Sequence, residues 1–294
     1  MNILKEIWRK RHFYLLLLLP LILYSLFIFY PIIDVIRLSL LEHPYWPDQR
    51  FVGVDNYIKI FTADPRFYNA FINNIIILVL SMIGNAGTGL LLAVALYSVK
   101  NTLLKKIYLI TFLWPYMMSS VAVGKLFQRL YDPYFGLLNV TFRSLGLESL
   151  TRVWLADPNI AMFSVWLACW WMSYPINMLI FYAGLQGIDR RLYESARIDG
   201  AGRLSIFRHI TIPCLRPIIL VVFTLITIGA FKVFDIVWVL GGGAPLQPFL
   251  DVLATLQFNL AWYFNYFGYG AALAIIMTVI IMVPTIVYLR MQEV

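Results

Sequence analysis

Long uncharged hydrophobic segments, separated by shorter polar ones, dominate the pattern of this 294-residue chain. Charged side chains are costly at the centre of a bilayer, and about 20 apolar residues are enough for a helix to cross it. Lipid-exposed backbone must satisfy its own hydrogen bonds, so these segments predict helices rather than the short alternating strands of a barrel. The pattern predicts an all-α integral membrane protein with six transmembrane helices, near residues 13–33, 73–98, 107–129, 160–184, 217–240 and 268–289.

The composition agrees with this prediction. The chain is 61% hydrophobic and 13% charged, with a mean hydropathy of +0.78, whereas a soluble domain has about 25% charged residues. These values exclude a cytosolic enzyme, a disordered chain and a disulfide-built secreted domain, and they predict one transmembrane domain over residues 1–294. The first hydrophobic segment is long for a signal peptide and lacks a small-residue cleavage site, so we interpret it as a retained anchor. Cys169 and Cys214 lie in different contexts and predict neither a disulfide nor a metal site.

The distribution of Lys and Arg predicts the orientation of the chain. The N-terminal segment, the second and fourth loops and the C-terminal tail together carry 14 basic residues, against seven in the loops of the other side. Both termini are therefore expected in the cytoplasm. The net charge of +8 mostly reflects this asymmetry, and no basic patch with exposed readout residues indicates a nucleic-acid partner.

The loop over residues 185–217 differs from the rest of the chain because it holds nine charged residues. Its composition predicts a helix over Arg190–Arg197, a break at Gly200-Ala201-Gly202 and a second short helix over Leu204–Ile210. Ala196 lies four residues before the first glycine, so small side chains share one face and permit close approach to another surface. The residues alone leave open whether this segment is a docking surface or a solvated loop with ordinary amphipathic helices.

Three short motifs in this loop resemble a known family. Glu194-Ser195-Ala196 is followed after two residues by Asp199-Gly200-Ala201, and eight residues later by Ile210-Thr211-Ile212-Pro213. This spacing resembles the EAA loop of ABC-importer permeases, in which Glu-Ala-Ala, Asp-Gly-Ala and Ile-x-Leu-Pro stand at the same intervals. Other segments resemble its carbohydrate-uptake branch: residues 51–57, 234–235, 241–245 and 268–272. The family often has Ile-Pro at the start of the loop, where this chain has Ile188-Asp189.

The resemblance implies the permease subunit of a type I ABC importer, a multi-pass protein of the bacterial cytoplasmic (inner) membrane. It implies that the loop forms coupling helices that dock on a cytoplasmic ATPase. It also implies a second permease subunit, two ATPase subunits and an extracytoplasmic solute-binding protein as partners, with lipid around the spans. The residues expected in ATPase coupling are Glu194, Ser195, Ala196, Asp199, Gly200, Ala201, Ile210 and Pro213.

No catalytic or cofactor motif is found in the sequence. The chain lacks a Gly-x-x-x-x-Gly-Lys-Ser/Thr phosphate loop, and its three histidines lie far apart in loops. We therefore expect a transport subunit that is not itself an enzyme and binds no cofactor, with ATP and Mg used by the partner ATPases. The alternative is a self-powered secondary transporter or channel, for which inverted repeats, broken helices or a chain of intramembrane acids are typical. Only one acid, Asp235, lies within a predicted span, which argues against a secondary transporter. The resemblance to the EAA loop favours the importer.

Two charges within the fifth predicted span are candidates for contact with the cargo. Lys232 and Asp235 are three residues apart and share a helix face, so one alternative is a purely structural ion pair. A lysine in a low-dielectric cavity would otherwise attract an anionic cargo, such as a uronate-containing saccharide or a glycerol phosphate.

The fourth predicted span is rich in aromatic residues. Sugars stack on aromatic rings, which makes Trp170, Trp171 and Tyr174 cavity candidates, and Ser173 and Asn177 nearby could supply hydrogen bonds. The alternative for the aromatic residues is ordinary packing or an interfacial aromatic belt.

Overall fold

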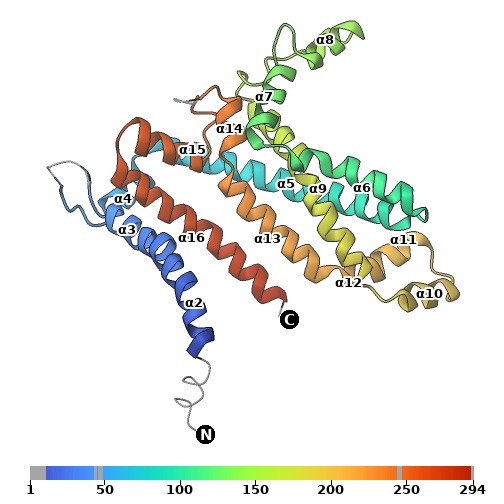
Figure 1. The fold of residues 1–294 in the computed structure, drawn as a ribbon. Coiled ribbons are helices and arrows are strands. Elements are labelled where there is room, and N and C mark those ends of the chain that lie inside the picture. The colour runs from blue at the N-terminus through green and yellow to red at the C-terminus, as the bar shows by residue number, and fades with distance from the viewer. Residues whose placement is uncertain (1–10, 43–44, 46–48, 244–246, 293–294) are drawn as a thin grey trace. The chain divides into compact units, whose positions relative to one another are not determined.

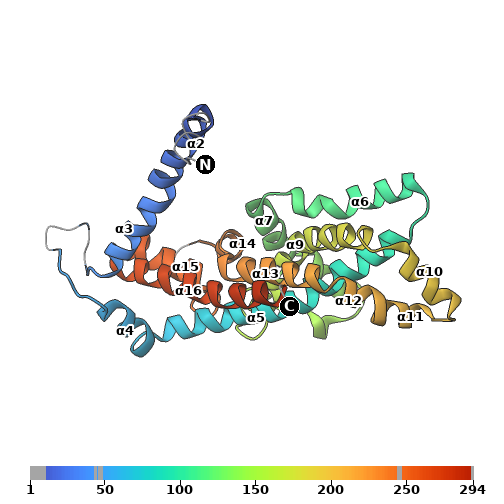
Figure 2. The same ribbon diagram turned by 90° about the horizontal axis from the view of Figure 1, so that it is seen from below.

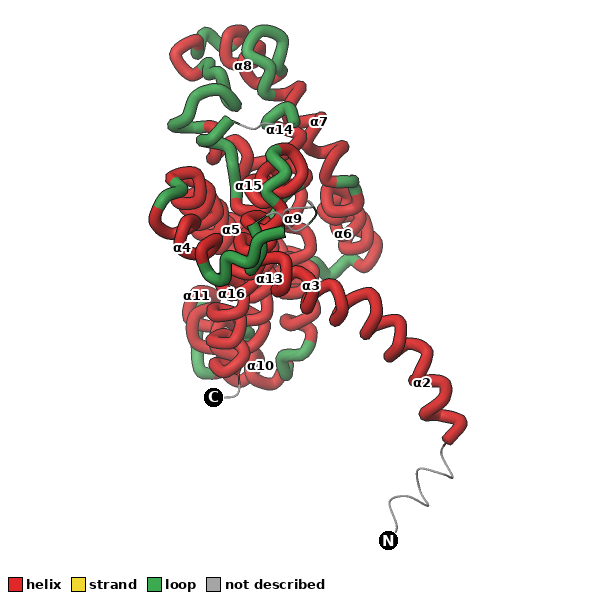
Figure 3. Tube along the Cα trace, turned by 90° about the vertical axis from the view of Figure 1, so that its left-hand side faces the viewer, coloured by secondary structure: helices red, strands yellow, loops and turns green. Residues whose placement is uncertain are grey.

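The computed structural model describes residues 11–42, 45, 49–243 and 247–292. Figure 3 shows that the elements of the described residues are helices joined by loops, without a strand. This confirms the predicted all-α class. The chain divides into two compact units, one formed by residues 1–63 with 260–276 and the other by residues 64–259 with 277–294.

The first unit contains a long N-terminal helix, drawn in blue in Figure 1. It runs through α2 (Arg11–Tyr24), the π-helical turn η1 (Ser25–Phe29) and α3 (Tyr30–Ser39). It extends six residues past the predicted end of the first span. The short helix α4 (Asp55–Thr62) follows.

Two distant sequence motifs meet within this first unit. The side-chain amide of Asn56 donates to the carbonyl oxygens of Ser39, at 2.8 Å, and Leu41, at 3.0 Å. Gly268 lies against the same Leu41 carbonyl, so closely that a Cβ atom would clash with it. The motifs at 51–57 and 268–272 therefore both pack on the end of α3.

The second unit is a helical bundle in which α5, α9 and α13 pack against one another (Figures 1 and 2). Helix α6 lies along α9, and α7 packs on α14. The elements in chain order are α5 (Pro65–Ser98), α6 (Thr102–Met117), α7 (Ser120–Leu130), α8 (Leu137–Ser144), η2 (Glu148–Leu150), α9 (Ala161–Gln186), α10 (Arg190–Ile198), α11 (Arg203–Ile206), η3 (Phe207–Thr211), α12 (Ile212–Cys214), α13 (Arg216–Lys232), α14 (Asp235–Leu240) and α15 (Leu253–Phe258). The π-helical η4 (Asn259–Tyr263) and α16 (Phe267–Gln292) each cross the boundary between the units.

Side-chain caps set the starts of several helices. Asp64 accepts from the backbone N–H of Arg66 at 2.9 Å, and Pro65 occupies the first turn, where its missing N–H is not needed. Helix α5 therefore begins eight residues before the predicted span. Asn101 and Ser119 cap α6 and α7 in the same way. The aromatic segment before α16 is π-helical as far as Tyr263.

Four helical segments are long and apolar enough to cross a membrane: 16–39, 65–98, 216–240 and 267–291. Helices α6 and α7 would make a fifth span together, although a 90° bend separates them. Helix α9 has 26 residues and matches the predicted fourth span in position. The total of six spans stays a prediction.

Two predicted spans are interrupted, which the hydrophobic pattern did not indicate. The third breaks at residues 118–119, where Pro115 lies in the last turn of α6 and Ser119 caps α7. The fifth breaks at residues 233–234, between α13 and α14. There the amide of Asn74, on α5, donates to the Ala230 carbonyl oxygen at 2.7 Å. In a continuous helix this oxygen would accept from the N–H four residues on.

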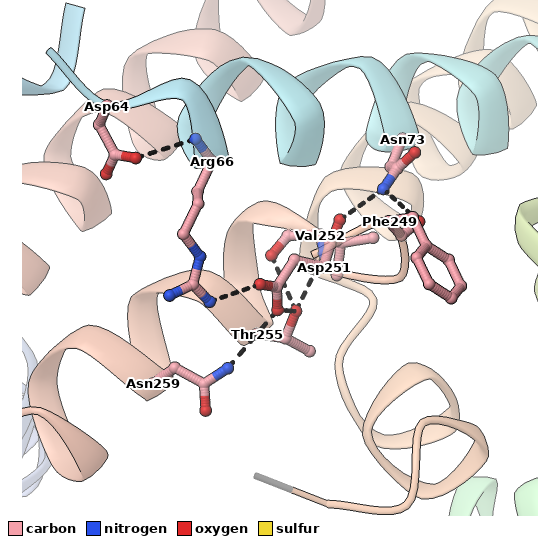
Figure 4. Close-up of polar contacts among 8 residues, drawn as sticks. All are labelled: Asp64, Arg66, Asn73, Phe249, Asp251, Val252, Thr255 and Asn259. Atoms are coloured by element: carbon pink, nitrogen blue, oxygen red, sulfur yellow. Dashed lines mark hydrogen bonds and ion pairs between the residues drawn. The ribbon is translucent and has the colours of Figure 1, made fainter. Parts of the chain in front are cut away.

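A buried polar network joins the start of α5 to the extended segment before α15 (Figure 4). The guanidinium of Arg66 contacts the fully buried carboxylate of Asp251 at 2.7 Å, and Thr255 also donates to this carboxylate. The amide of Asn73 donates to the carbonyl oxygens of Phe249 and Asp251. These bonds satisfy the backbone hydrogen-bonding groups of a non-helical segment that is shielded from water.

Candidate functional site

A cavity of about 290 Å³ lies in the second unit, between α5, α6, α7, α9, α13 and α14. Most of its wall is apolar, as in most small-molecule sites. The polar and charged side chains that line it are Ser81, Asn85, Tyr116, Ser120, Ser173, Asn177, Lys232 and Asp235. The structure therefore brings together four of the seven candidate residues, from helices separated in sequence by more than 40 positions.

Both interrupted helices contribute their breaks to this cavity. Ser120 belongs to the first turn of α7, while Lys232 ends α13 and Asp235 begins α14. The second halves of the two broken helices pack tightly. A Cβ atom on Gly124 of α7 would lie 2.8 Å from Val239 Cγ1 of α14, so only glycine fits there without a shift. The cavity thus lies where both spans change direction.

Lys232 and Asp235 do not pair with each other. The hydroxyl of Ser120 donates to Asp235 Oδ2 at 2.7 Å, and this bond links the two helix breaks. Lys232 is exposed in the isolated chain and has no hydrogen bond or ion pair to any described residue. The structural ion pair considered from the sequence is therefore not formed, because the break between α13 and α14 removes the shared helix face.

The opposite wall of the cavity carries neutral amides and hydroxyls. The Asn85 amide donates to Ser173 Oγ at 2.6 Å, and the Asn177 amide donates to the backbone oxygen of Ser173 at 3.1 Å. The Asn85 Oδ1 atom is buried and accepts no hydrogen bond from the described residues. Buried acceptors are nearly always paired, so this unpaired oxygen is an exception among the buried polar atoms of the described residues. Sequence reasoning missed Asn85, although an asparagine within a hydrophobic run was a usable signal.

The aromatic residues of α9 are not part of the cavity wall. Trp170 packs on α5, where its indole N–H donates to Thr88 Oγ1 at 3.2 Å, and it stacks on Tyr174 with ring centroids 5.5 Å apart. Trp171 packs on Phe127 of α7 with a centroid separation of 5.7 Å. None of the three rings belongs to the lining of this cavity. The packing alternative describes Trp170 and Trp171, whose side chains contact Thr88 on α5 and Phe127 on α7, and a cargo contact for Trp170, Trp171 and Tyr174 stays a prediction.

The 185–217 loop has the two-part form expected from its sequence. Asp189 caps α10 and accepts from Arg191, whose side chain and then backbone hydrogen bonds lower the pKa of this carboxyl. Gly200 has a φ of +77°, the left-handed conformation that lets the chain turn after α10. The second part is helical from Arg203 and becomes π-helical at Phe207, so it differs in detail from the predicted 204–210 helix.

A side-chain contact between α10 and η3 joins the two parts of this loop. Tyr193 OH lies 3.3 Å from Thr211 Oγ1, and burial raises the pKa of the Tyr193 phenol. Glu194 is exposed and has no hydrogen bond or ion pair among the described residues. The motif residues lie in one segment of the structure: Glu194, Ser195, Ala196, Asp199, Gly200, Ala201, Ile210 and Pro213.

Residues 85–293 match the family described as the binding-protein-dependent transport system inner membrane component. The chain is 33% identical to a probable ABC transporter permease, YurN, of Bacillus subtilis, with 94% of each chain covered. It is 33% identical to the trehalose/maltose transport system permease MalF of Thermococcus litoralis, covering 94% of this chain and 92% of that one. It is also 32% identical to the sulfoquinovosyl glycerol permease SmoG of Agrobacterium fabrum, over 92% of this chain and 86% of that one.

The fold also matches a solved structure. A bacterial ABC transporter that imports the acidic polysaccharide alginate contains a chain with a TM-score of 0.86 and 23% identity. The match covers 100% of this chain and 99% of the other. The chain therefore belongs to the family of binding-protein-dependent transport system inner membrane components, the multi-pass permeases of ABC importers.

Proposed function

We propose that this permease translocates a saccharide carrying an anionic group, delivered by a solute-binding protein and driven by partner ATPases. The observation that carries the proposal is the unpaired Lys232 in a cavity that otherwise offers only neutral polar groups and the hydrogen-bonded Asp235. An ammonium group in a low-dielectric cavity attracts carboxylate or phosphate more strongly than in water. A relative that transports trehalose and maltose supports a saccharide cargo, and the structural likeness to an importer of the acidic polysaccharide alginate supports an anionic one.

Within this proposal, the two walls of the cavity bind different parts of the cargo. Lys232 binds the anionic group, while the polar side chains of Asn85, Ser173 and Asn177 on the opposite wall face the neutral part of the sugar. The Ser173 hydroxyl accepts from the Asn85 amide and so holds the Asn85 side chain in place, and Asn177 extends the polar wall. Such placed polar groups in an apolar cavity are the usual basis of ligand orientation.

The test is uptake by the assembled transporter in proteoliposomes. Lys232→Gln should raise the KM for an acidic oligosaccharide about tenfold or more, which corresponds to about 1.4 kcal/mol. Lys232→Arg, which keeps the charge, should restore most of the affinity. Uptake of a neutral saccharide and basal ATP hydrolysis serve as controls. Unchanged uptake of acidic cargo by Lys232→Gln would contradict the anionic class while leaving the permease function intact.

We further propose that the loop from α10 to α12 faces the cytoplasm, with both termini on the same side, and docks on a partner ATPase. The unpaired Glu194 and the small Ala196 leave one part of α10 open for close contact. Ile198 and Leu204 are among the most exposed apolar side chains of the described chain, at 86% and 79%. Exposed apolar side chains bordered by charges are typical of protein-interaction surfaces. ATP and Mg are then used by the ATPase pair, and a second permease completes the membrane part.

Copurification tests this docking. Glu194→Lys and Gly200→Trp should abolish transport and weaken retention of the ATPase subunit while the chain still inserts into the membrane. Glu148→Lys, a charge reversal at an exposed position outside the loop, is the matched control and should transport normally. Full assembly and uptake in both loop variants would overturn the docking proposal.

A further inference from the structure

The glycines inside the helices of the second unit differ in whether packing explains them. Gly84, Gly124 and Gly184 each lie against a neighbouring helix, and a Cβ atom added to any of them would come within 3.0 Å of a side chain on that helix. Close approach of two helices requires such small residues. Gly229 of α13 is different, because a Cβ atom there would have no neighbour within 4 Å. Helix packing within the described chain therefore does not explain Gly229.

The backbone of α13 does not require a glycine at this position either. Gly229 lies inside the helix, three residues before its end at Lys232, and it is not among the glycines with a positive φ. Within a helix, glycine is less favourable than alanine because it loses more conformational freedom on folding. A residue that departs from local preference in this way is expected at functional sites.

Gly229 lies in the wall of the cavity that contains Lys232. Leu225, four residues earlier, and Lys232, three residues later, line the same cavity, so the three positions share one face of α13. Because the Cβ position of Gly229 is open, the wall has a recess between these two longer side chains. The cavity holds about 290 Å³, at the small end of the roughly 300–1,000 Å³ of ligand sites. A side chain at position 229 would therefore remove a substantial part of the available space.

The charge beside the recess indicates what occupies it. The Lys232 ammonium group has no partner among the described residues, and enclosing an unpaired charge in apolar packing is unfavourable. A polar ligand in the recess avoids this penalty, whereas an apolar side chain of another subunit does not. The recess is therefore better suited to cargo than to a packing contact.

We propose that Gly229 determines the size of the sugar unit that the cavity accepts, a role that rests on the proposed saccharide cargo. The sugar ring that carries the anionic group lies against the α13 backbone at Gly229, while the anionic group itself contacts Lys232. Specificity depends on excluding the wrong ligand as well as on binding the right one. A larger side chain at position 229 would compete with the ring for the same space and would exclude larger cargo first.

A graded series of substitutions in the assembled, reconstituted transporter tests this role. Gly229→Ala, Gly229→Val and Gly229→Leu are compared for uptake of a uronate monosaccharide and the corresponding disaccharide. The ratio of disaccharide to monosaccharide uptake should fall in that order, by about tenfold or more for Gly229→Leu, the usual size of steric discrimination in a fitted site. Glucose and maltose, measured in the same vesicles, separate the effect of cargo size from the effect of cargo charge.

Gly87 supplies the matched control. It lies on α5, and its Cβ position also has no atom within 4 Å, but it does not line the cavity. Gly87→Ala should leave the uptake ratio unchanged. The unfolding midpoint of Gly229→Ala should not fall below that of the wild type, because alanine favours the helix. Selective loss of large cargo without loss of stability would separate a size effect from a folding defect.

Three results would overturn the role of Gly229. An equal fall in uptake of both sugars would mean a general effect on α13 rather than on cargo size. Unchanged uptake by Gly229→Leu would place the recess outside the path of the cargo. Loss of the second permease when Gly229→Leu is purified would mean that a side chain of that subunit fills the recess. None of these results alters the charge test at Lys232, and the neutral pair still tests Gly229 if the cargo is not anionic.

Discussion

Two sets of acidic and basic side chains in the second unit differ in whether they pair with each other. Arg66 and Asp251 are 185 positions apart in sequence, yet they form a direct ion pair that Thr255 reinforces. Lys232 and Asp235 are three positions apart, yet they remain unpaired with each other. Sequence proximity therefore says little about pairing in this bundle, because helix breaks and distant contacts decide which groups meet.

The difference also separates structural charge from functional charge. In a buried ion pair the two charges neutralise each other, and removing one partner leaves an uncompensated buried charge. An unpaired ammonium group beside a cavity keeps its full capacity to bind an anion. We therefore expect substitutions in the first set to change stability, and substitutions in the second to change transport.

The largest effect is expected for Asp251→Ala. It leaves the Arg66 guanidinium without its carboxylate and should lower the free energy of unfolding by about 3–5 kcal/mol, the usual range for half of a buried pair. Denaturant unfolding of the purified complex, followed by loss of helical signal, measures this. The double variant Arg66→Met/Asp251→Leu should recover most of the stability, since the apolar pair leaves no charge unpaired. A double variant as unstable as Asp251→Ala would show that Asp251 acts through other partners.

A smaller loss of stability is expected for Asn74→Leu. This change removes the link between the helix break at residues 233–234 and the start of α15. Its amide bonds the Ala230 carbonyl oxygen and its Oδ1 accepts from the Leu253 N–H at 2.8 Å. Each buried group left unpaired should lower the free energy of unfolding by about 1–3 kcal/mol. Uptake should fall as well, because the break that places Lys232 in the cavity is no longer held. Asn73→Leu, which leaves the Ala230 contact intact, is the matched comparison, and equal uptake by both variants would argue against this coupling.

The smallest effect on stability is expected for Lys232→Met. Loss of an unpaired charge should change the free energy of unfolding by no more than about 0.5 kcal/mol, as at sites without specific contacts. The same unfolding assay, applied beside Asp251→Ala, checks this value. A loss above about 2 kcal/mol, the size expected when a paired buried charge is removed, would mean that Lys232 has a structural partner and would collapse the distinction between the two sets.

The hydrophobic pattern was enough to predict the helical class and the positions of most long helices. The EAA segment was recognised from a different signal, the spacing of its three motifs along the chain. The ends of α5 and α10 follow from caps beside them, at Asp64 and Asp189. In each of these cases the cause of the structure lies within a few residues of its effect.

The cavity could be predicted only in part, because the contacts that shape it join residues far apart in the sequence. No proline or glycine interrupts the chain at residues 233–234; the break is stabilised by Asn74 on another helix. Without this contact, the sequence favours one continuous helix with Lys232 and Asp235 on the same face. The packing of Trp170 could not be predicted from the sequence for the same reason, since its hydrogen-bond partner is Thr88 on α5.

The break held by Asn74 also has a consequence for the order of assembly. A segment that is helix-forming throughout should enter the bilayer as one uninterrupted helix, with its backbone fully hydrogen-bonded and Ala230 bonded to Phe234. The amide of α5 can replace that bond only after the two helices have met. The bend is therefore made late, by association within the membrane, and the cavity does not exist until the bundle has formed around it.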